Sequence, residues 1–372
     1  GYYTIAIDKN PNADGFDFAD EFAAVDIIDQ ESCLKYAKEK SIDGVITAAT
    51  DYGVLSAAYV ARELCIPGLN YDVARIIKNK YKIRQKLSES KTDDFSQFYE
   101  VNSLEDLNEI KDSITYPVMV KPCDGSGSKA VKRVGSYAEL LPACEAAMAS
   151  SLTGKALIED FIVGKEYGVE SFVYNSQVYV LGVMGKHMTA PPDYAELGHC
   201  FPSGLPIEDK VKKVVESSIK ALGINFGAVN MDVLISEDYR VHIVDVGARM
   251  GGNLIGSHII PIGTGFDYMG NLIRAAAGDV VDLTAAKSDN SIATRILALT
   301  PGKVEGLPDF DQIKKDLNVD IYCHLKVGDD IHKYHNNLDG CGYVVAVANH
   351  IEEAERRANK AKEIIDSGIK RF

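Results

Sequence analysis

Two aspartates inside one predicted β-hairpin constrain this chain more than any other feature of its sequence. The largely apolar runs 229–235 and 241–246 flank the polar turn 237–240, and this pattern predicts two antiparallel strands. If the turn has an even number of residues, Asp232 lies directly opposite Asp245. Side chains paired in this way have Cβ atoms about 4.5–5.5 Å apart. The hairpin therefore brings two carboxylates together between apolar strands.

Two carboxylates at this separation repel each other and are unfavourable to bury unless a cation lies between them. Ligation by oxygen alone favours Mg²⁺, or Mn²⁺, with phosphate oxygens and water completing the coordination shell. We therefore predict that Asp232 and Asp245 are metal ligands. Arg249 follows in a Gly-rich turn, where its guanidinium can reach a phosphate or a carboxylate. The alternative is that both aspartates are exposed on a polar face of the sheet.

Length and composition narrow the class of protein. A chain of 372 residues holds two or three domains, and its net charge of -14 argues against a nucleic-acid partner. No apolar run approaches the roughly 18–20 residues of a membrane span, and no signal-peptide pattern opens the chain. We therefore expect no membrane partner and a cytoplasmic location. The 7 cysteines include no C-x-x-C pair and no Cys/His cluster at zinc spacing, which predicts reduced thiols.

Strand and helix patterns alternate over residues 1–78, which predicts a parallel α/β domain. The expected elements are strands at 2–8 and 44–49 and helices at 31–40 and 54–64. The chain begins on what reads as a second strand, so we expect this domain to lack its first strand and helix. Asp8 and Asp51 follow the two strands, and the carboxyl ends of parallel strands are common ligand sites. The alternative is that both are polar loop residues only.

A connecting helix is predicted over residues 71–87, followed by two further blocks. The second block extends from about residue 79 to 280, and the third covers 281–372. The third is predicted to contain strands at 291–299, 319–325 and 342–348 and a helix at 351–365. This mixture predicts an α+β domain at the C-terminus.

A glycine- and serine-rich turn follows the predicted strand 116–122, which carries Lys121 near its end. Small residues with free backbone N–H groups can form a flap over phosphate oxygens, and serine hydroxyls add donors. The predicted flap residues are Gly125, Ser126, Gly127 and Ser128. The chain contains no Walker A loop and no G-x-G-x-x-G motif that opens a helix, so a nicotinamide cofactor is not expected. The alternative is a plain hairpin connection.

A second apolar strand, predicted over residues 155–162, ends in acidic residues. The backbone of a short extended segment can pair with an adenine edge, and a carboxylate can accept hydrogen bonds from ribose hydroxyls. The candidates for these roles are Glu159, Asp160, Ile162 and Glu166. Each carboxylate taken singly is more simply a surface charge. Their order along the chain with the lysines, the flap and the acidic hairpin favours a nucleotide site.

That order of motifs resembles the ATP-grasp superfamily from Asn79 to Gly256. The resemblance implies an α/β fold of the mixed ATP-grasp type, with ATP and Mg²⁺ or Mn²⁺ as cofactors. It implies an N-terminal domain (1–78), an ATP-grasp domain (79–280, with a flap at about 115–172) and a C-terminal domain (281–372). The residues that match the family's nucleotide and metal motifs are Lys80, Lys121, the flap 124–131, Glu159, Asp160, Ile162, Glu166, Asp232 and Asp245.

Two departures from the family pattern affect the predicted metal site. Many relatives have Asn two residues after the second metal acid, where this chain has Gly247. Metal carboxylates in the family are often Glu, whereas both here are the shorter Asp, which draws the ion towards the backbone. The sequence therefore leaves open whether one or two metal ions bind.

The run 245–252 looks most like the corresponding run of the amino-acid ligases that make dipeptides. The segment 194–203 resembles their substrate-side loop. The resemblance suggests Glu196, His199 and Asn253 as substrate residues. The alternative for His199 is a loop histidine that is packed for structure alone.

The resemblance implies a two-step ligase reaction between a small-molecule carboxylate and a small-molecule amine. The carboxylate attacks the γ-phosphate of ATP to give an acyl phosphate and ADP, and the amine then displaces phosphate. Lys80, Lys121 and the metal would neutralise charge on the phosphoryl group, and Arg249 would hold the acyl phosphate, so Arg249 and Lys121 are the expected catalytic residues. The alternatives are an enzyme of the phosphoribosylamine–glycine ligase type and a nucleotide-binding protein without turnover. The oligomeric state stays open, and a homodimer is compatible with the sequence.

Overall fold

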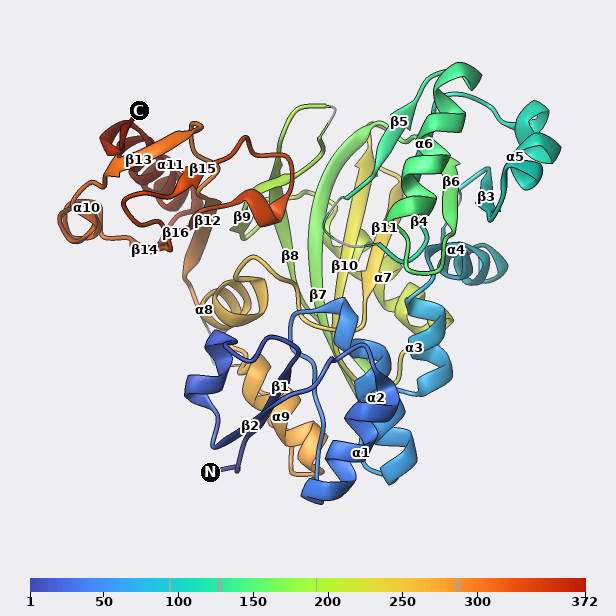
Figure 1. The fold of residues 1–372 in the computed structure, drawn as a ribbon, viewed down its shortest axis with the longest axis horizontal. Coiled ribbons are helices and arrows are strands. Elements are labelled where there is room, and N and C mark those ends of the chain that lie inside the picture. Colours follow the sequence, from blue (N-terminus) through green and yellow to red (C-terminus); the bar gives the residue numbers. More distant parts are fainter. Residues whose placement is uncertain (94, 126, 128, 192, 286–287) are drawn as a thin grey trace.

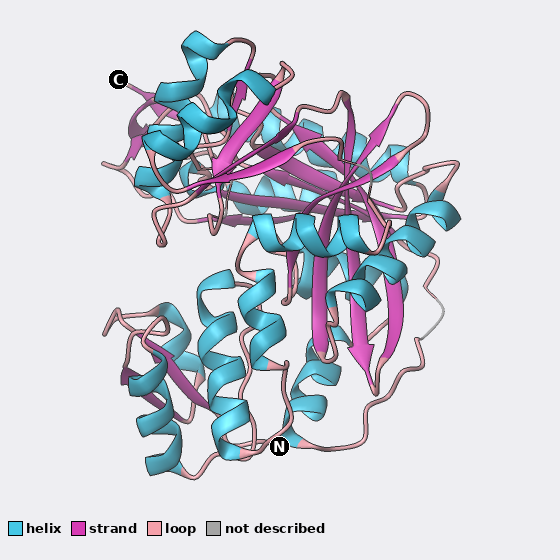
Figure 2. Ribbon diagram, turned by 90° about the vertical axis from the view of Figure 1, so that its right-hand side faces the viewer, coloured by secondary structure: helices cyan, strands magenta, loops and turns pink. Residues whose placement is uncertain are grey.

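The structure, a computed structural model, describes residues 1–372 apart from 94, 126, 128, 192 and 286–287. An eight-stranded sheet runs through the middle of the molecule, with helices and smaller sheets around it (Figures 1 and 2). This mixture confirms the predicted α/β class. Among the helices described, none is long and apolar enough to cross a membrane.

The N-terminal region contains a small parallel sheet with helices beside it, which agrees with the predicted class, but its second strand lies at 21–24, where no strand was predicted. Its main elements are β1 (Ile5–Asp8), β2 (Glu21–Ala24), α1 (Gln30–Lys40) and α2 (Val54–Leu64). Helix α1 begins after Asp29, whose carboxylate accepts the backbone N–H of Ser32 and caps the helix. Helices α1 and α2 pack on each other and bury Leu34 and Val60 in a common core.

Residues 44–49 do not form the predicted strand. Strand β1 pairs with β2, and no strand in the described part of the chain pairs with 44–49, so this apolar run has no ladder to join. Its backbone is used elsewhere, because the carbonyl of Ala48 accepts the N–H of Met250 at 2.9 Å. The segment therefore ties the N-terminal region to the Gly-rich turn that carries Arg249.

The predicted helix 71–87 is two helices. Helix α3 (Tyr71–Ile77) ends before Asn79, whose side chain accepts a backbone N–H from the first turn of α4 (Lys80–Glu89). Asparagine is a preferred cap because its side-chain oxygen satisfies a donor that the helix leaves unpaired. The break places Lys80 in the first turn of α4, at the edge of a large cleft.

A separate four-stranded antiparallel sheet forms the flap region, in the order β3-β6-β4-β5. Its strands are β3 (Phe98–Val101), β4 (Val118–Pro122), β5 (Lys132–Val134) and β6 (Ala156–Asp160). Helix α5 (Leu104–Ile110) packs beside β3, and α6 (Tyr137–Ser150) packs on β4 (Figure 1). The strands predicted at 116–122 and 155–162 are thus confirmed with shorter bounds.

The eight-stranded sheet is antiparallel throughout and has the order β11-β10-β7-β8-β9-β12-β16-β14. Its strands are β7 (Gly164–Tyr174), β8 (Gln177–Met188), β9 (Glu196–Phe201), β10 (Gly227–Ser236), β11 (Val241–Gly247), β12 (Ser291–Ile296), β14 (Asp320–Cys323) and β16 (Gly342–Ala348). Because β9 pairs with β12, the sheet continues from the predicted middle domain into the predicted C-terminal one.

The hairpin β10–β11 pairs Asp232 with Asp245, as predicted, although the predicted even-length turn is wrong. The N–H of Ser236 donates to the carbonyl of Arg240 at 3.1 Å, which leaves the odd-length loop 237–239. An odd loop alone would shift the pairing by one residue, but a bulge next to Asp232 restores it. Two departures from the expected geometry therefore cancel.

Amphipathic helices close the apolar faces of the sheet. Helix α7 (Glu208–Leu222) turns an apolar stripe toward it, and α9 (Tyr268–Ala277) packs against β10. The short α8 (Ile260–Thr264) contacts β8 and β12. The buried residues of α7 on this stripe are Val211, Val215, Ile219 and Leu222.

The C-terminal region packs helices on the far end of the sheet. It adds α10 (Phe310–Leu317), α11 (Ile351–Gly368), β13 (Gly302–Gly306), β15 (Asp330–Ile331) and β17 (Lys370–Arg371). Helix α11 lies against β12 and β16 and buries Ala354, Ala358 and Ala361, which are small enough for close approach. The strands and the helix predicted here are confirmed, with ends shifted by a few residues.

Gly198 offers a test of the join between β9 and β12. Its φ is 151°, and an added Cβ would lie 2.1 Å from the carbonyl oxygen of Thr294 on β12. We expect Gly198→Ala to lower the free energy of unfolding by roughly 2–5 kcal/mol, from backbone strain and overpacking together. Denaturant titration measures this. Gly15→Ala, where an added Cβ meets nothing within 4 Å, should change it by less than about 0.5 kcal/mol, and equal effects would contradict the prediction.

Candidate active site

A cleft of about 670 Å³ lies between the flap sheet and the hairpin end of the central sheet. The predicted site residues on its wall are Lys80, Lys121, Gly125, Gly127, Glu159, Asp160, Ile162, Glu166, Glu196, Asp232, Asp245, Arg249 and Asn253. His199 is fully buried behind this wall. Ser126 and Ser128 lie outside the described residues. The fold thus gathers side chains from distant parts of the sequence around one cavity.

Glu159 is buried between two cations at the flap end of the cleft. Arg84 Nε lies 2.6 Å from one carboxylate oxygen, and Lys121 Nζ lies 2.6 Å from the other. Both cations also donate to the carbonyl of Val244, at 2.9 and 3.1 Å, where the β11 bulge turns it toward them. Burial opposes ionisation, but Arg84 and Lys121 hold the pKa of Glu159 below its usual value. Glu159 therefore positions Lys121.

Asp245 has a lysine partner of its own. Lys80 Nζ lies 2.5 Å from Asp245 Oδ1, which joins the first turn of α4 to β11. Burial would raise the pKa of Asp245, but attraction by Lys80 and Lys121 holds it at about 2. The carboxylate is therefore ionised at neutral pH.

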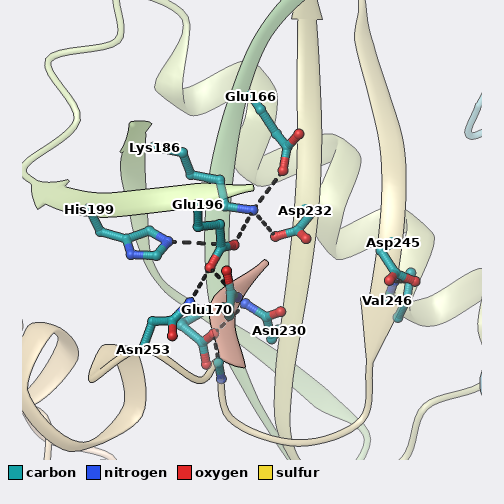
Figure 3. Close-up of polar contacts among 12 residues, drawn as sticks. Glu166, Glu170, Lys186, Glu196, His199, Asn230, Asp232, Asp245, Val246 and Asn253 are labelled. Atoms are coloured by element: carbon teal, nitrogen blue, oxygen red, sulfur yellow. Dashed lines mark hydrogen bonds and ion pairs between the residues drawn. The ribbon is translucent and has the colours of Figure 1, made fainter. Parts of the chain in front are cut away.

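Asp232 belongs to a cluster around the buried ammonium of Lys186 on β8 (Figure 3). Lys186 Nζ lies 2.7 Å from Glu166, 2.7 Å from Glu196 and 2.8 Å from Asp232. Burial and the two neighbouring carboxylates raise the pKa of Asp232 to about 7, while Lys186 opposes the rise. One positive charge therefore faces three acidic groups, and the cluster has an excess of negative charge.

Arg249 is held by an aspartate from the N-terminal region. Its Nη2 lies 2.8 Å from Asp51 Oδ2 and its Nε 3.1 Å from Asp51 Oδ1, so the planar fork receives both oxygens of one carboxylate. Its Nη1 donates to Asn230 Oδ1 at 3.2 Å and to the carbonyl of Met250 at 2.9 Å. The geometry shows that this fork can bind a pair of anionic oxygens at the edge of the cleft.

Glu170 lies buried beneath the Gly-rich turn, among three donors. It accepts hydrogen bonds from Tyr268 Oη (2.7 Å), Asn230 Nδ2 (2.7 Å) and the backbone N–H of Gly251 (2.9 Å). Burial raises the pKa of Glu170 to about 8, against the effect of these donors and of Arg249. Since Asn230 contacts both Glu170 and Arg249, the network links a buried carboxyl group to the guanidinium.

The Gly-rich turn and the C-terminal region complete the wall around Glu196. The amide of Asn253 and the amide of Asn337 (3.3 Å) donate to its carboxylate, and Tyr334 donates to its backbone carbonyl. His199 Nε2 lies 3.8 Å from the same carboxylate (Figure 3), and among the described residues neither ring nitrogen of His199 has a hydrogen-bond partner. Burial lowers the pKa of His199 to about 4, so the ring is neutral at pH 7.

The sequence analysis did not identify several residues that contact the predicted ones in the cleft, directly or through one another, among them Arg84, Glu170, Lys186, Asn230 and Tyr334. One signal was available for two of them. Lys186 is the one charge in the run 178–186 and Glu170 the one charge in the run 167–174, and charges are rarely buried without a partner. The sequence did not reveal which partners they meet.

Comparisons with known proteins agree with this geometry. Residues 114–257 match the ATP-grasp domain family model, and residues 295–369 match the model of L-amino acid ligase C-terminal domain 2. An uncharacterized protein, y4rH, of Sinorhizobium fredii is 24% identical over 363 residues, covering 95% of this chain and 74% of that protein. The ATP-grasp enzyme fsqD of Aspergillus fumigatus is 25% identical, covering 75% of this chain and 55% of that protein.

Solved structures show the same fold. The L-amino acid ligase from Bacillus licheniformis aligns with a TM-score of 0.81 at 22% identity, covering 95% of this chain and 88% of that one. The phosphoribosylglycinamide synthetase from Anaerococcus prevotii aligns with a TM-score of 0.74 at 23% identity, covering 97% of this chain and 91% of that one. The chain therefore contains an ATP-grasp domain, over residues 114–257. Further along, residues 295–369 form a domain of the type found at the C-terminus of L-amino acid ligases.

Glu170 predicts a specific pH dependence of stability. An unperturbed glutamate titrates near 4.5, whereas folded Glu170 titrates at about 8. Between these values the folded state keeps a proton that the unfolded state has lost, so the free energy of unfolding falls as pH rises. Glu170→Gln lacks this proton equilibrium, so its melting temperature relative to wild type should increase from pH 5 to pH 8. Calorimetry measures this, and Glu237→Gln in the exposed turn is the control. If the melting temperatures of Glu170→Gln and wild type changed with pH in the same way, the raised pKa of Glu170 would be contradicted.

Proposed function

We propose that this protein is an ADP-forming ligase that joins a carboxylate to an amine through an acyl phosphate, with substrates of the amino-acid type. The observation that carries the proposal is the single cleft in which Lys80, Lys121, Asp232, Asp245 and Arg249 converge. The match to an ATP-grasp domain supports ATP as the energy source. The match to a C-terminal domain of L-amino acid ligases supports the substrate class.

ATP would lie between the flap sheet and the acidic hairpin. The extended segment 160–162 would meet the adenine, and Glu166 would accept from the ribose. Lys121, fixed by Glu159, supplies a positive charge at the flap end, and Lys80 supplies another beside Asp245. The glycines at 125 and 127 line the same cavity, where backbone N–H groups can meet phosphate oxygens.

Asp232 and Asp245 would hold Mg²⁺, or Mn²⁺, together with phosphate oxygens. The donor set fits, because two carboxylates are paired across the hairpin and both line the cleft. The excess negative charge around Lys186 also supports a metal ion here, since an added cation would compensate that charge. When bound, the ion would stabilise charge on the transferring phosphoryl group.

The protein's own groups account for the remaining steps. A substrate carboxylate oxygen bonds to the γ-phosphorus as the bond to ADP breaks, and the two lysines offset the charge on the phosphoryl oxygens. The fork of Arg249 would exchange Asp51 for oxygens of the acyl phosphate. The amine nitrogen then bonds to the acyl carbon, phosphate leaves, and the nitrogen loses a proton. The flap would exclude water that otherwise hydrolyses the intermediate.

One experiment distinguishes the proposed function from two alternatives. The fold likeness to a phosphoribosylglycinamide synthetase keeps a phosphoribosylamine–glycine ligase as the second candidate. A nucleotide-binding protein without turnover is the third. The test is ADP release on mixing the protein with ATP, Mg²⁺ and either a panel of amino acids or phosphoribosylamine with glycine. Release that requires amino acids alone supports the proposal, and no release with any substrate overturns it.

Asp245→Asn tests the metal carboxylate. The amide retains the shape but loses the negative charge, so we expect ADP release to fall by at least about a hundredfold while the fold persists. Asp238→Asn is the matched control, because Asp238 lies in the exposed turn of the same hairpin. Circular dichroism checks the fold. Activity near that of wild type in a folded Asp245→Asn variant would contradict the assignment.

Arg249→Lys separates a catalytic from a structural arginine. Lysine keeps the charge but lacks the planar fork that now binds both oxygens of Asp51. If the fork holds the acyl phosphate, ATP affinity should stay near normal and turnover should fall by ~10²–10³. If Arg249 serves only to hold Asp51, the melting temperature should fall while turnover per folded molecule is unchanged. Measurements of ATP affinity, melting temperature and ADP release on one preparation distinguish these results, with Arg240→Lys as control.

A further inference from the structure

Three side chains that commonly bind metals meet outside the cleft. They are His187 near the end of β8, Cys200 on β9 and Glu355 in the first part of α11. One nitrogen, one sulfur and one carboxylate oxygen from these residues all lie within 4.8 Å of one another. His187 Nε2 already lies 2.7 Å from Glu355 Oε1. Glu355 is 168 residues from His187 in the sequence, so only the fold brings the three side chains together.

The strand register places this cluster behind the cleft wall. Lys186 pairs with His199 across β8 and β9, and both belong to the face shown in Figure 3. Because successive residues of a strand alternate between faces, His187 and Cys200 point to the opposite face. Neither lines the cleft. The cluster is therefore separate from the proposed nucleotide and substrate site, although it adjoins it through the backbone.

Glycines provide the space between the ligands. His187 pairs with Gly198, and Cys200 pairs with Gly185. A Cβ added at Gly185 would lie only 2.6 Å from Cys200 Sγ, so the sulfur occupies space that any other residue would fill. The side chain of His187 is 41% exposed and that of Glu355 29% exposed, which leaves a path for an ion and a water molecule from solvent.

Glu355 is oriented by neighbours in the way that metal-binding carboxylates usually are. Arg295 Nη2 lies 3.0 Å from Glu355 Oε1, and Arg295 Nε donates to Asn359 at 2.6 Å. Such outer contacts fix the direction of a ligand and are typical of metal sites. The bonds from His187 and Arg295 both use Oε1, and we assign the second oxygen to the ion.

We propose that His187, Cys200 and Glu355 bind a divalent transition metal of the zinc type, with a water molecule in the fourth position. One thiolate, one imidazole and one carboxylate suit a borderline-soft ion and disfavour Mg²⁺ and Ca²⁺, which prefer oxygen alone. Binding displaces the thiol proton of Cys200, which is released to solvent as the metal–sulfur bond forms. The ion would fasten α11 to β8 and β9 directly behind Lys186 and His199, and so stiffen the substrate wall.

The test uses the full chain, treated with a chelator and then titrated with Co²⁺ and with Zn²⁺. We expect one equivalent of Co²⁺ to release one proton and to give a thiolate-to-cobalt charge-transfer absorption, and Zn²⁺ to replace the Co²⁺ and abolish the absorption without further proton release. In Cys200→Ser the absorption should disappear, and Zn²⁺ affinity should fall by more than the roughly 10–100-fold typical of losing an outer-shell partner. Cys323→Ser is the matched control, because Cys323 is also a partly buried free thiol.

Glu355→Gln is a second variant, which leaves the thiol in place and should weaken Co²⁺ binding without removing sulfur. The proposal is overturned if wild type gives no charge-transfer absorption, or if the absorption survives in Cys200→Ser. It is also overturned if Cys323→Ser loses the absorption instead. None of these readouts requires ligase activity, so they stand apart from the outcome of the ADP-release experiment.

Discussion

Compensation of buried charge along the cleft is the constraint on which the rest of the structure depends. The ammonium of Lys186 holds carboxylates from β7, β9 and β10, and Lys80 joins α4 to β11 through Asp245. Arg84 and Lys121 surround Glu159 and join α4 to the flap sheet. Removing one member of such a buried pair leaves an unpaired charge, which lowers the free energy of unfolding by about 3–5 kcal/mol. These contacts therefore fix both the chemistry of the cleft and the positions of the elements around it.

The end of the cleft around Arg249 and Glu196 is built by all three regions of the chain. The N-terminal region contributes Asp51 to the fork of Arg249, and the C-terminal region contributes Tyr334 and Asn337 around Glu196. This arrangement is possible because the central sheet continues through β9 and β12 into the C-terminal strands. This end of the cleft thus depends on contacts between regions, whereas the end around Lys121 and Glu159 depends on α4, the flap sheet and the hairpin.

Much of the fold and the candidate site was predictable from local patterns. The helix Val54–Leu64 and the strand Gly342–Ala348 have the bounds that periodicity predicts. The pairing of Asp232 with Asp245 was also predicted, but through an even-length turn that does not occur. The failures have physical causes. The run 44–49 lacks a neighbouring strand, and Asn79 caps a new helix inside the segment predicted as one.

The sequence alone determined which residues carry charge, where most elements lie and which motifs follow one another, because these properties depend on near neighbours along the chain. The tertiary structure decided which cation neutralises which carboxylate. Lys186 and Asp232 are 46 residues apart, and Arg249 and Asp51 are 198 apart. It also decided that His187 and Cys200 face Glu355, away from the cleft. Such pairs form only when strands and helices pack, since ion pairing and metal ligation depend on distance in space and not on separation in sequence.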